Sequence, residues 1–118
     1  MPIKSIEKET FTYLVYKRES LHDYMEFKDE LDRFVKTKDS KKDVVVDFTK
    51  SDSITEGEAG LLANVLKKFM GTKRTLRLIV TKPIQEKLNS QNLFMSDNLM
   101  IFNSHKLFLE FLEKPKEA

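Results

Sequence analysis

Cysteine and tryptophan are absent from the 118-residue sequence, and glycine and proline occur only three times each. The absence of cysteine excludes disulfides, thiolate metal sites and cysteine nucleophiles. Apolar runs are far shorter than the roughly 20 residues that span a bilayer. The first residues lack the apolar segment of a secretory signal. We therefore expect a cytoplasmic protein with no membrane-inserted part.

The charge balance is nearly even, with 21 Lys or Arg against 19 Asp or Glu and a net charge of +2. Such a balance favours solubility and indicates no particular partner. The length suits one domain, because domains cluster near roughly 100–150 residues. We expect this domain to span residues 1–113 and the polar residues 114–118 to form a frayed C-terminal end.

Strand and helix patterns alternate along the chain. Runs rich in β-branched and aromatic residues predict strands at residues 3–8, 10–17, 43–49, 75–81 and 99–102. Apolar residues at three- and four-residue steps predict helices at residues 23–37 and 55–70, and two more that begin near Pro83 and Ser104. This order predicts an α/β fold with a mostly parallel or mixed sheet of four to five strands, about four helices and right-handed crossovers.

Two of the predicted helices carry signals at their ends. The helix after Ile54 opens with a capping box, in which Thr55 caps the third amide and Glu58 reaches back, and Gly71 ends it. Ser104 is expected to cap the last helix. The residues expected to face the core are Leu61, Leu62, Val65, Leu66 and Phe69 in the first of these helices and Leu107, Phe108, Phe111 and Leu112 in the last.

Candidate catalytic residues are scarce. The two histidines, His22 and His105, fall at predicted helix starts, away from any nucleophile motif or metal-ligand spacing, which favours surface or capping roles. The three glycines are too far apart for a dinucleotide-binding or phosphate-binding loop. Glu56 and Glu58 are better explained by the positive end of a helix than by acid–base chemistry. We therefore expect no enzymatic activity, no cofactor and no metal.

A basic cluster allows two interpretations. It consists of Lys67, Lys68, Lys73, Arg74 and Arg77, and acidic residues are absent from residues 64–85. Such a cluster can contact nucleic-acid phosphates. Alternatively, it complements the negative end of a helix and continues into the exposed start of a strand. Aromatic residues are few in this segment, and we favour the second interpretation, with no nucleic-acid partner.

A receiver domain would also have this length and an α/β pattern. Asp47 ends an apolar strand, and residues 81–83 (TKP) are similar to the strand-terminal Lys-Pro of receivers. Residues 17–19 (KRE), however, occupy the place where receivers carry an acidic pair for magnesium. The 35 residues from Asp47 to Lys82 also hold only one helix and one strand, about half of what a receiver needs. The receiver interpretation is therefore disfavoured.

Residues 44–112 resemble the STAS domain, the fold of anti-sigma factor antagonists, stressosome subunits and the cytoplasmic tails of anion transporters. The apolar strand ends in the pair Asp47-Phe48, and a short polar loop leads to residues 54–62 (ITEGEAGLL) and an amphipathic helix. Residues 82–94 (KPIQEKLNSQNLF) look like the family's short third helix and its ending, with Asn92 where glycine is usual. The strand at 10–17 and the helix at 23–37 also follow the family's order.

The STAS switch is a loop that reads Asp-Ser-Ser-Gly or Asp-Ser-Thr-Gly at the start of the second helix. In the family, a kinase anti-sigma factor phosphorylates the second hydroxyl residue of this loop. By resemblance, the four positions fall on Thr55, Glu56, Gly57 and Glu58. The phosphoacceptor position is then Gly57, which has no hydroxyl.

Another register places Asp52 and Ser53 on the first two positions of the switch, and Ile54 then occupies the acceptor position. Ser53 and Thr55 are the nearest hydroxyls, and they stay open as phosphorylation sites. Glu56 and Glu58 could supply a fixed charge in place of a phosphate and so hold a constitutive state. They could equally serve only to cap the helix, which we favour.

The resemblance implies a non-enzymatic, bacterial regulatory module that binds a protein partner and acts in transcription signalling. A histidine-kinase-like anti-sigma factor is the expected class of partner. The expected contact and switch residues are Ser53, Thr55, Glu56, Gly57 and Glu58. The alternative is a structural STAS subunit that self-associates, for example as a homodimer, or assembles a signalling complex. A small-ligand module is a third class, for which the sequence shows no pocket.

Overall fold

A computed structural model describes residues 3–20, 23–35, 42–51, 53–90 and 97–113. Within these ranges the elements follow the predicted order. They are β1 (Ile3–Glu7), β2 (Phe11–Tyr16), α1 (Asp23–Val35), β3 (Asp43–Asp47), α2 (Glu56–Phe69), β4 (Leu76–Ile79), α3 (Lys82–Ser90), β5 (Leu99–Phe102) and α4 (His105–Glu113). The predictions for His22, Asp52, Asn92 and the C-terminal residues 114–118 lie outside the described residues.

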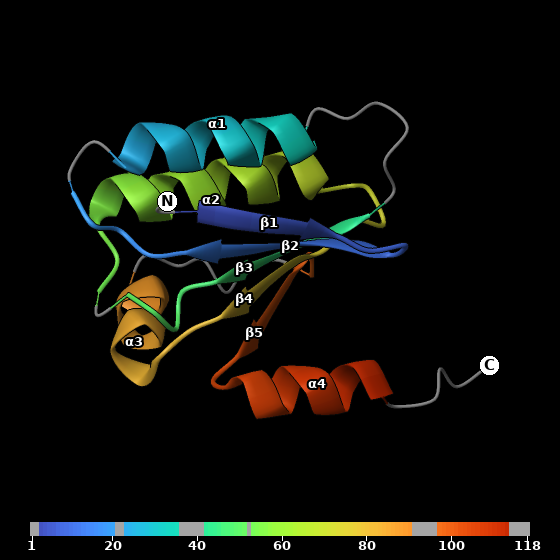
Figure 1. The fold of residues 1–118 in the computed structure, drawn as a ribbon. Coiled ribbons are helices and arrows are strands. Elements are labelled where there is room, and N and C mark those ends of the chain that lie inside the picture. The colour runs from blue at the N-terminus through green and yellow to red at the C-terminus, as the bar shows by residue number, and fades with distance from the viewer. Residues whose placement is uncertain (1–2, 21–22, 36–41, 52, 91–96, 114–118) are drawn as a thin grey trace.

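The strands form one mixed sheet in the order β1-β2-β3-β4-β5. β1 runs antiparallel to β2, and each later strand runs parallel to its predecessor. Strands added in chain order with right-handed crossovers place their connecting helices on one face of the sheet. Figure 1 shows α1 and α2 side by side on one face, α3 at one end of the sheet, and α4 alone below the other face.

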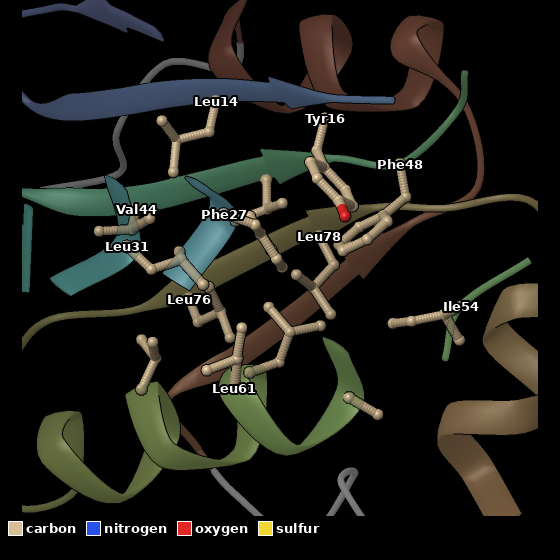
Figure 2. Close-up of a cluster of buried hydrophobic side chains, with 14 of the residues drawn as sticks. Leu14, Tyr16, Phe27, Leu31, Val44, Phe48, Ile54, Leu61, Leu76 and Leu78 are labelled. Atoms are coloured by element: carbon tan, nitrogen blue, oxygen red, sulfur yellow. The ribbon is translucent and has the colours of Figure 1, made fainter. Parts of the chain in front are cut away.

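The larger core lies between the sheet and α1 and α2. Tyr16, Phe27 and Phe48 form its aromatic centre, with the rings of Tyr16 and Phe27 stacked 4.2 Å apart and Phe48 edge-on to both (Figure 2). All five apolar residues predicted for the stripe of α2 are buried, which confirms that prediction. Ile84 and Leu88 of α3 join the same cluster. The sheet therefore has one thickly covered face.

The opposite face is covered by α4 alone. Phe108 is buried there against Val45, Ile79 and Phe102, and Ser104 Oγ accepts the Leu107 amide at 3.2 Å, as the predicted cap requires. Leu107 and Leu112 were expected to face the core, and that prediction is wrong, since their exposed fractions are 47% and 39%. The reason is geometric: the five apolar residues of this helix spread over about half of its circumference, and the sheet covers only part of that arc.

Two arginines of the basic cluster serve the fold. The Arg74 guanidinium donates to the carbonyls of Phe34, Val35 and Lys42, where α1 ends and the chain returns to the sheet. Arg77 forms an ion pair with Asp43 at 2.7 Å. Internal bonding of this kind supports the structural interpretation of the cluster.

Candidate functional site

The loop between β3 and α2 is fixed by a reciprocal cap. Thr55 Oγ1 accepts the Glu58 amide at 3.1 Å, and Glu58 Oε1 accepts the Thr55 amide at 2.9 Å. This is the predicted capping box, and it satisfies two amides that the first turn of α2 would otherwise leave unpaired. We call residues 53–58 the loop site.

Glu58 also makes buried contacts outside the capping box. Its side chain is 1% exposed, because it lies in helical register with Leu61, Leu62 and Val65 of the buried stripe. Its two oxygens meet two donors from β2 and the residues after it, Arg18 Nη1 and the Tyr16 hydroxyl, each at 2.5 Å. A buried carboxylate requires such partners, because an unpaired charge in the interior is costly. Glu58 therefore ties the start of α2 to the end of β2.

Burial, followed by the hydrogen bond to Glu58, raises the pKa of the Tyr16 hydroxyl well above its ordinary value. The hydroxyl therefore stays protonated at physiological pH and remains a donor to the carboxylate. The second terminal nitrogen of Arg18 donates to Ser53 Oγ at 3.2 Å. One guanidinium thus holds both the loop and the helix that follows it.

Gly57 is exposed, but the ring of Tyr24 from α1 borders it closely. A Cβ atom added at Gly57 would lie 3.0 Å from Tyr24 Cε2. Contacts this short require the ring to shift. The position expected to carry the phosphoacceptor therefore has no hydroxyl and little room for one.

The exposed part of the loop site consists of Ser53, Glu56 and Gly57, whereas Thr55 is half-buried and Glu58 is buried. The structure thus divides the five residues predicted for this site. Three face solvent, where a partner could contact them. The other two form the internal support of the loop.

Replacing Thr55 with Ala is expected to lower the free energy of unfolding by about 1 kcal/mol, because the Glu58 amide loses its acceptor. Thr55→Ser keeps the hydroxyl and is the matched control, with little expected loss. Urea denaturation followed by circular dichroism measures both. Equal stability of the two variants would contradict the capping role of the hydroxyl.

A second buried carboxylate, Asp47, lies at the end of β3 towards the face covered by α4. The hydroxyls of Tyr13 and Thr49 donate to it at 2.7 and 2.6 Å, and the Thr49 amide does so at 2.8 Å. His105 Nε2, from the first turn of α4, hydrogen-bonds to the same carboxylate. We call these four residues the Asp47 cluster. It attaches the start of α4 to the sheet.

Burial alone would raise the pKa of the Asp47 carboxyl, but hydrogen bonds from Thr49, His105 and Tyr13 outweigh that effect and hold the pKa below its ordinary value. Asp47 is therefore ionised at neutral pH, and its carboxylate accepts the hydrogen bonds described above. A carboxylate so fully engaged has little capacity left to act as a base. The arrangement supports a structural role for the cluster.

Sequence reasoning missed three partners at these sites. Arg18 and Tyr16 bind Glu58 from 40 and 42 residues away, and His105 binds Asp47 from 58 residues away. One signal was available: Glu58 precedes Leu61, Leu62 and Val65 by three, four and seven residues and so belongs to their buried face. A charged residue in a buried stripe predicts a buried partner.

The described residues hold no cluster of three or more His, Cys, Asp or Glu that could bind a metal ion. Among the helices described, none combines the length and the hydrophobicity that a bilayer span requires.

The sequence matches no protein-family model and no curated protein. Several solved structures share its fold, and two of them are described here by their similarity. A candidate anti-sigma factor antagonist from Thermotoga maritima is 16% identical, with a TM-score of 0.66 over 96% of this chain and 94% of that chain. A variant of RsbS from Moorella thermoacetica is 14% identical, with a TM-score of 0.74 over 95% of each chain. In both comparisons the likeness covers nearly the whole chain. The chain therefore has the STAS fold, which is the fold that the sequence predicted.

Proposed function

We propose that this chain is a non-enzymatic regulatory module that binds a protein partner through the loop site, in one state that phosphorylation does not switch. The fold it shares with an anti-sigma factor antagonist and with RsbS supports a regulatory role. The expected partner is a histidine-kinase-like anti-sigma factor in the bacterial cytoplasm.

One observation carries the proposal: the buried carboxylate of Glu58, held by Arg18 and Tyr16, fixes the loop without any added group. Glu56 adds a second, exposed carboxylate to the same helix end, where negative charge is favourable. A phosphate on Gly57 is chemically impossible. The charge that the loop presents to solvent beside Ser53 is therefore the carboxylate of Glu56, whereas that of Glu58 is buried and paired.

Binding tests this proposal directly. Affinity for a histidine-kinase-like anti-sigma factor from the same organism is measured by titration calorimetry, once with ATP and once with a non-hydrolysable analogue. Equal affinities are expected, because Gly57 at the acceptor position has no hydroxyl to modify. Glu56→Lys is expected to weaken binding at least tenfold, as loss of a central charged contact often does, whereas Glu86→Lys on α3 is the exposed control.

Gly57→Ser tests whether the acceptor position can be restored. We expect little incorporation of phosphate, because the new Cβ would meet the Tyr24 ring and Glu56 would repel the phosphate. Adding Tyr24→Ala removes the ring and should raise incorporation severalfold. Intact-mass spectrometry after incubation with the kinase and ATP measures the product.

The wild-type chain is the control for that experiment and should gain no phosphate. A stoichiometric phosphate on wild-type Ser53 or Thr55 would contradict the unswitched state, and it would show that the switch lies elsewhere in the same loop. Hydrolysis or group transfer by the purified chain would contradict the non-enzymatic role.

A structural subunit that self-associates is the second candidate function. The observation that favours it is the apolar stripe of α4 formed by Leu109 and Leu112, which are both exposed. That surface lies on the face of the sheet opposite α1 and α2 (Figure 1). The two candidate functions therefore use different parts of the molecule.

A further inference from the structure

β1 forms one edge of the sheet, and its outer side pairs with no strand in the described part of the chain. The Lys8 amide donates to the Phe11 carbonyl at 2.9 Å, which makes these two residues a hydrogen-bonded pair at the end of the β1–β2 ladder. Bonded and non-bonded pairs alternate along an antiparallel ladder, so Ile6 also bonds to β2. Ser5 and Glu7 therefore direct their amides and carbonyls away from the sheet.

A groove of about 830 Å³ runs along this open edge, between β1 and α1. Four successive residues of β1, 3–6, line the groove. Successive side chains of a strand point to opposite faces of its sheet, so a groove lined by all four borders the edge of the strand. Figure 1 shows β1 at the edge of the sheet, below α1. The four residues of β1 after Ile3 are all exposed, so both of its faces are open there as well.

The α1 wall of this groove is acidic. It is lined by Glu26, Asp29 and Glu30, together with Arg33. Arg33 forms an ion pair with Glu30 at 3.7 Å, which leaves the exposed carboxylates of Glu26 and Asp29 as the excess charge of the wall. Cationic side chains are therefore complementary to this side of the edge.

The other side of β1 is apolar. Ile6 is 51% exposed on that side. It lines a second groove, of about 350 Å³, with the exposed Leu109 and Leu112 of α4, and Lys8 and His105 also border this groove. An apolar side chain placed beside Ile6 would extend the surface that these leucines begin. The two sides of the edge thus favour different kinds of side chain.

We propose that the edge of β1 binds an extended segment of a protein partner, which adds an antiparallel strand and carries Lys or Arg at every second position with apolar residues between. Ser5 lies two residues after Ile3, which is part of the core under α1, so a residue opposite Ser5 faces the acidic wall. A residue opposite Ile6 faces α4. Main-chain hydrogen bonds to Ser5 and Glu7 hold the segment, and the two grooves select its sequence. These contacts do not involve the loop site, so the proposal is independent of the function proposed above.

The probe is a fluorescein-labelled peptide of sequence Thr-Lys-Val-Lys-Val-Lys-Thr with blocked ends, and fluorescence anisotropy measures its affinity for the full chain. We expect a dissociation constant in the micromolar to submillimolar range. Glutamate in place of each lysine should weaken binding at least about tenfold, because like charges then meet at the α1 wall. N-methylation of the lysine amides should weaken it as much, since these amides face β1 in antiparallel pairing. N-methylation of the valine amides, which face away, is the matched control and should have little effect.

Two variants of the chain test the same contacts. Ser5→Pro removes an outward amide and no bond to β2, and proline is tolerated at such positions of edge strands. It should weaken peptide binding at least about tenfold while the thermal unfolding temperature stays close to that of the wild type. Asp29→Lys should weaken binding severalfold. Asp32→Lys makes the same charge change on the same helix but lies between α1 and α2, and it is the control.

Amide hydrogen exchange followed by nuclear magnetic resonance locates the bound segment. The lysine peptide should slow exchange of the Ser5 and Glu7 amides at least about tenfold and leave the Ile6 amide unchanged, because that amide is already bonded to β2.

Three results would overturn the proposal. The first is absence of binding by the lysine peptide at submillimolar concentration. The second is equal affinity of the peptides methylated at lysine and at valine, because binding would then not depend on the predicted main-chain bonds. The third is protection of the Ser5 and Glu7 amides that rises with protein concentration in the absence of peptide, which would assign the edge to a second copy of the chain.

Discussion

Replacing Glu58 with Ala is expected to lower the free energy of unfolding by about 3 kcal/mol. The substitution leaves the buried Tyr16 hydroxyl without its acceptor, removes the charge partner of Arg18 and exposes the Thr55 amide at the start of α2. Removing one member of a buried pair costs more than the pair contributes, because the other member stays buried and unpaired. Urea denaturation followed by circular dichroism measures the loss.

Glu56→Ala is the matched control, because Glu56 lies two residues before Glu58 in the same first turn of α2. Glu56 is exposed, and only its attraction to the positive helix end is lost, so the cost should stay below about 1 kcal/mol. Glu58→Gln should fall between the two, since one amide oxygen keeps part of the bonding. Similar losses for Glu56→Ala and Glu58→Ala would mean that burial of Glu58 adds nothing to its role as a cap.

Replacing Asp47 with Asn is expected to cost about 2 kcal/mol at neutral pH. The amide group turns a donor towards one of the three donating side chains, Tyr13, Thr49 or His105, where the carboxylate accepted from all of them. Tyr13 and Thr49 are not fully exposed, so a lost bond there is not simply replaced by water. Thermal and urea denaturation at pH 7 measure the difference.

The stabilisation from Asp47 should depend on pH in one direction. The pKa of its carboxyl is lower in the folded chain than its ordinary value of 3.8. A carboxyl with a lowered pKa stabilises the fold fully at pH values above its pKa in the unfolded chain. This contribution is lost as the pH falls through its pKa in the folded chain. The difference between wild type and Asp47→Asn should therefore persist from pH 7 to pH 5 and shrink below about pH 4.

Asp97→Asn is the control for this titration, because it makes the same chemical change at an exposed position. A difference that shrinks already between pH 7 and pH 5 would contradict the assignment to Asp47.

Local signals predicted most of the fold. The capping box at Thr55 and Glu58 and the stripe of α2 each follow from residues within a few turns of one another, and the structure confirms them. In α4 the same method failed for Leu107 and Leu112. The leucines and phenylalanines of that helix spread over a wide arc, so periodicity could not identify which part of the arc faces the sheet.

The sequence predicted where the candidate site lies but not which residues support it. The residues of the loop site were found because they lie together in the sequence at the start of one helix. Their support comes from Tyr16 on β2, Arg18 after that strand and Tyr24 on α1. Only the folded chain brings these segments to the loop. Pairing across tens of residues leaves no local pattern, and a buried charge indicates only that some partner exists.

The sequential strand order has a consequence for how the chain folds during synthesis. Every strand pairs with the strand made just before it, so each new strand finds its partner already present as the chain leaves the ribosome. The antiparallel β1–β2 hairpin can form first and serve as the template for the parallel strands that follow. Sheets whose strands pair in chain order close smaller loops and fold faster than those with distant pairings. The last element made, α4, then closes the second face of a sheet that is already complete.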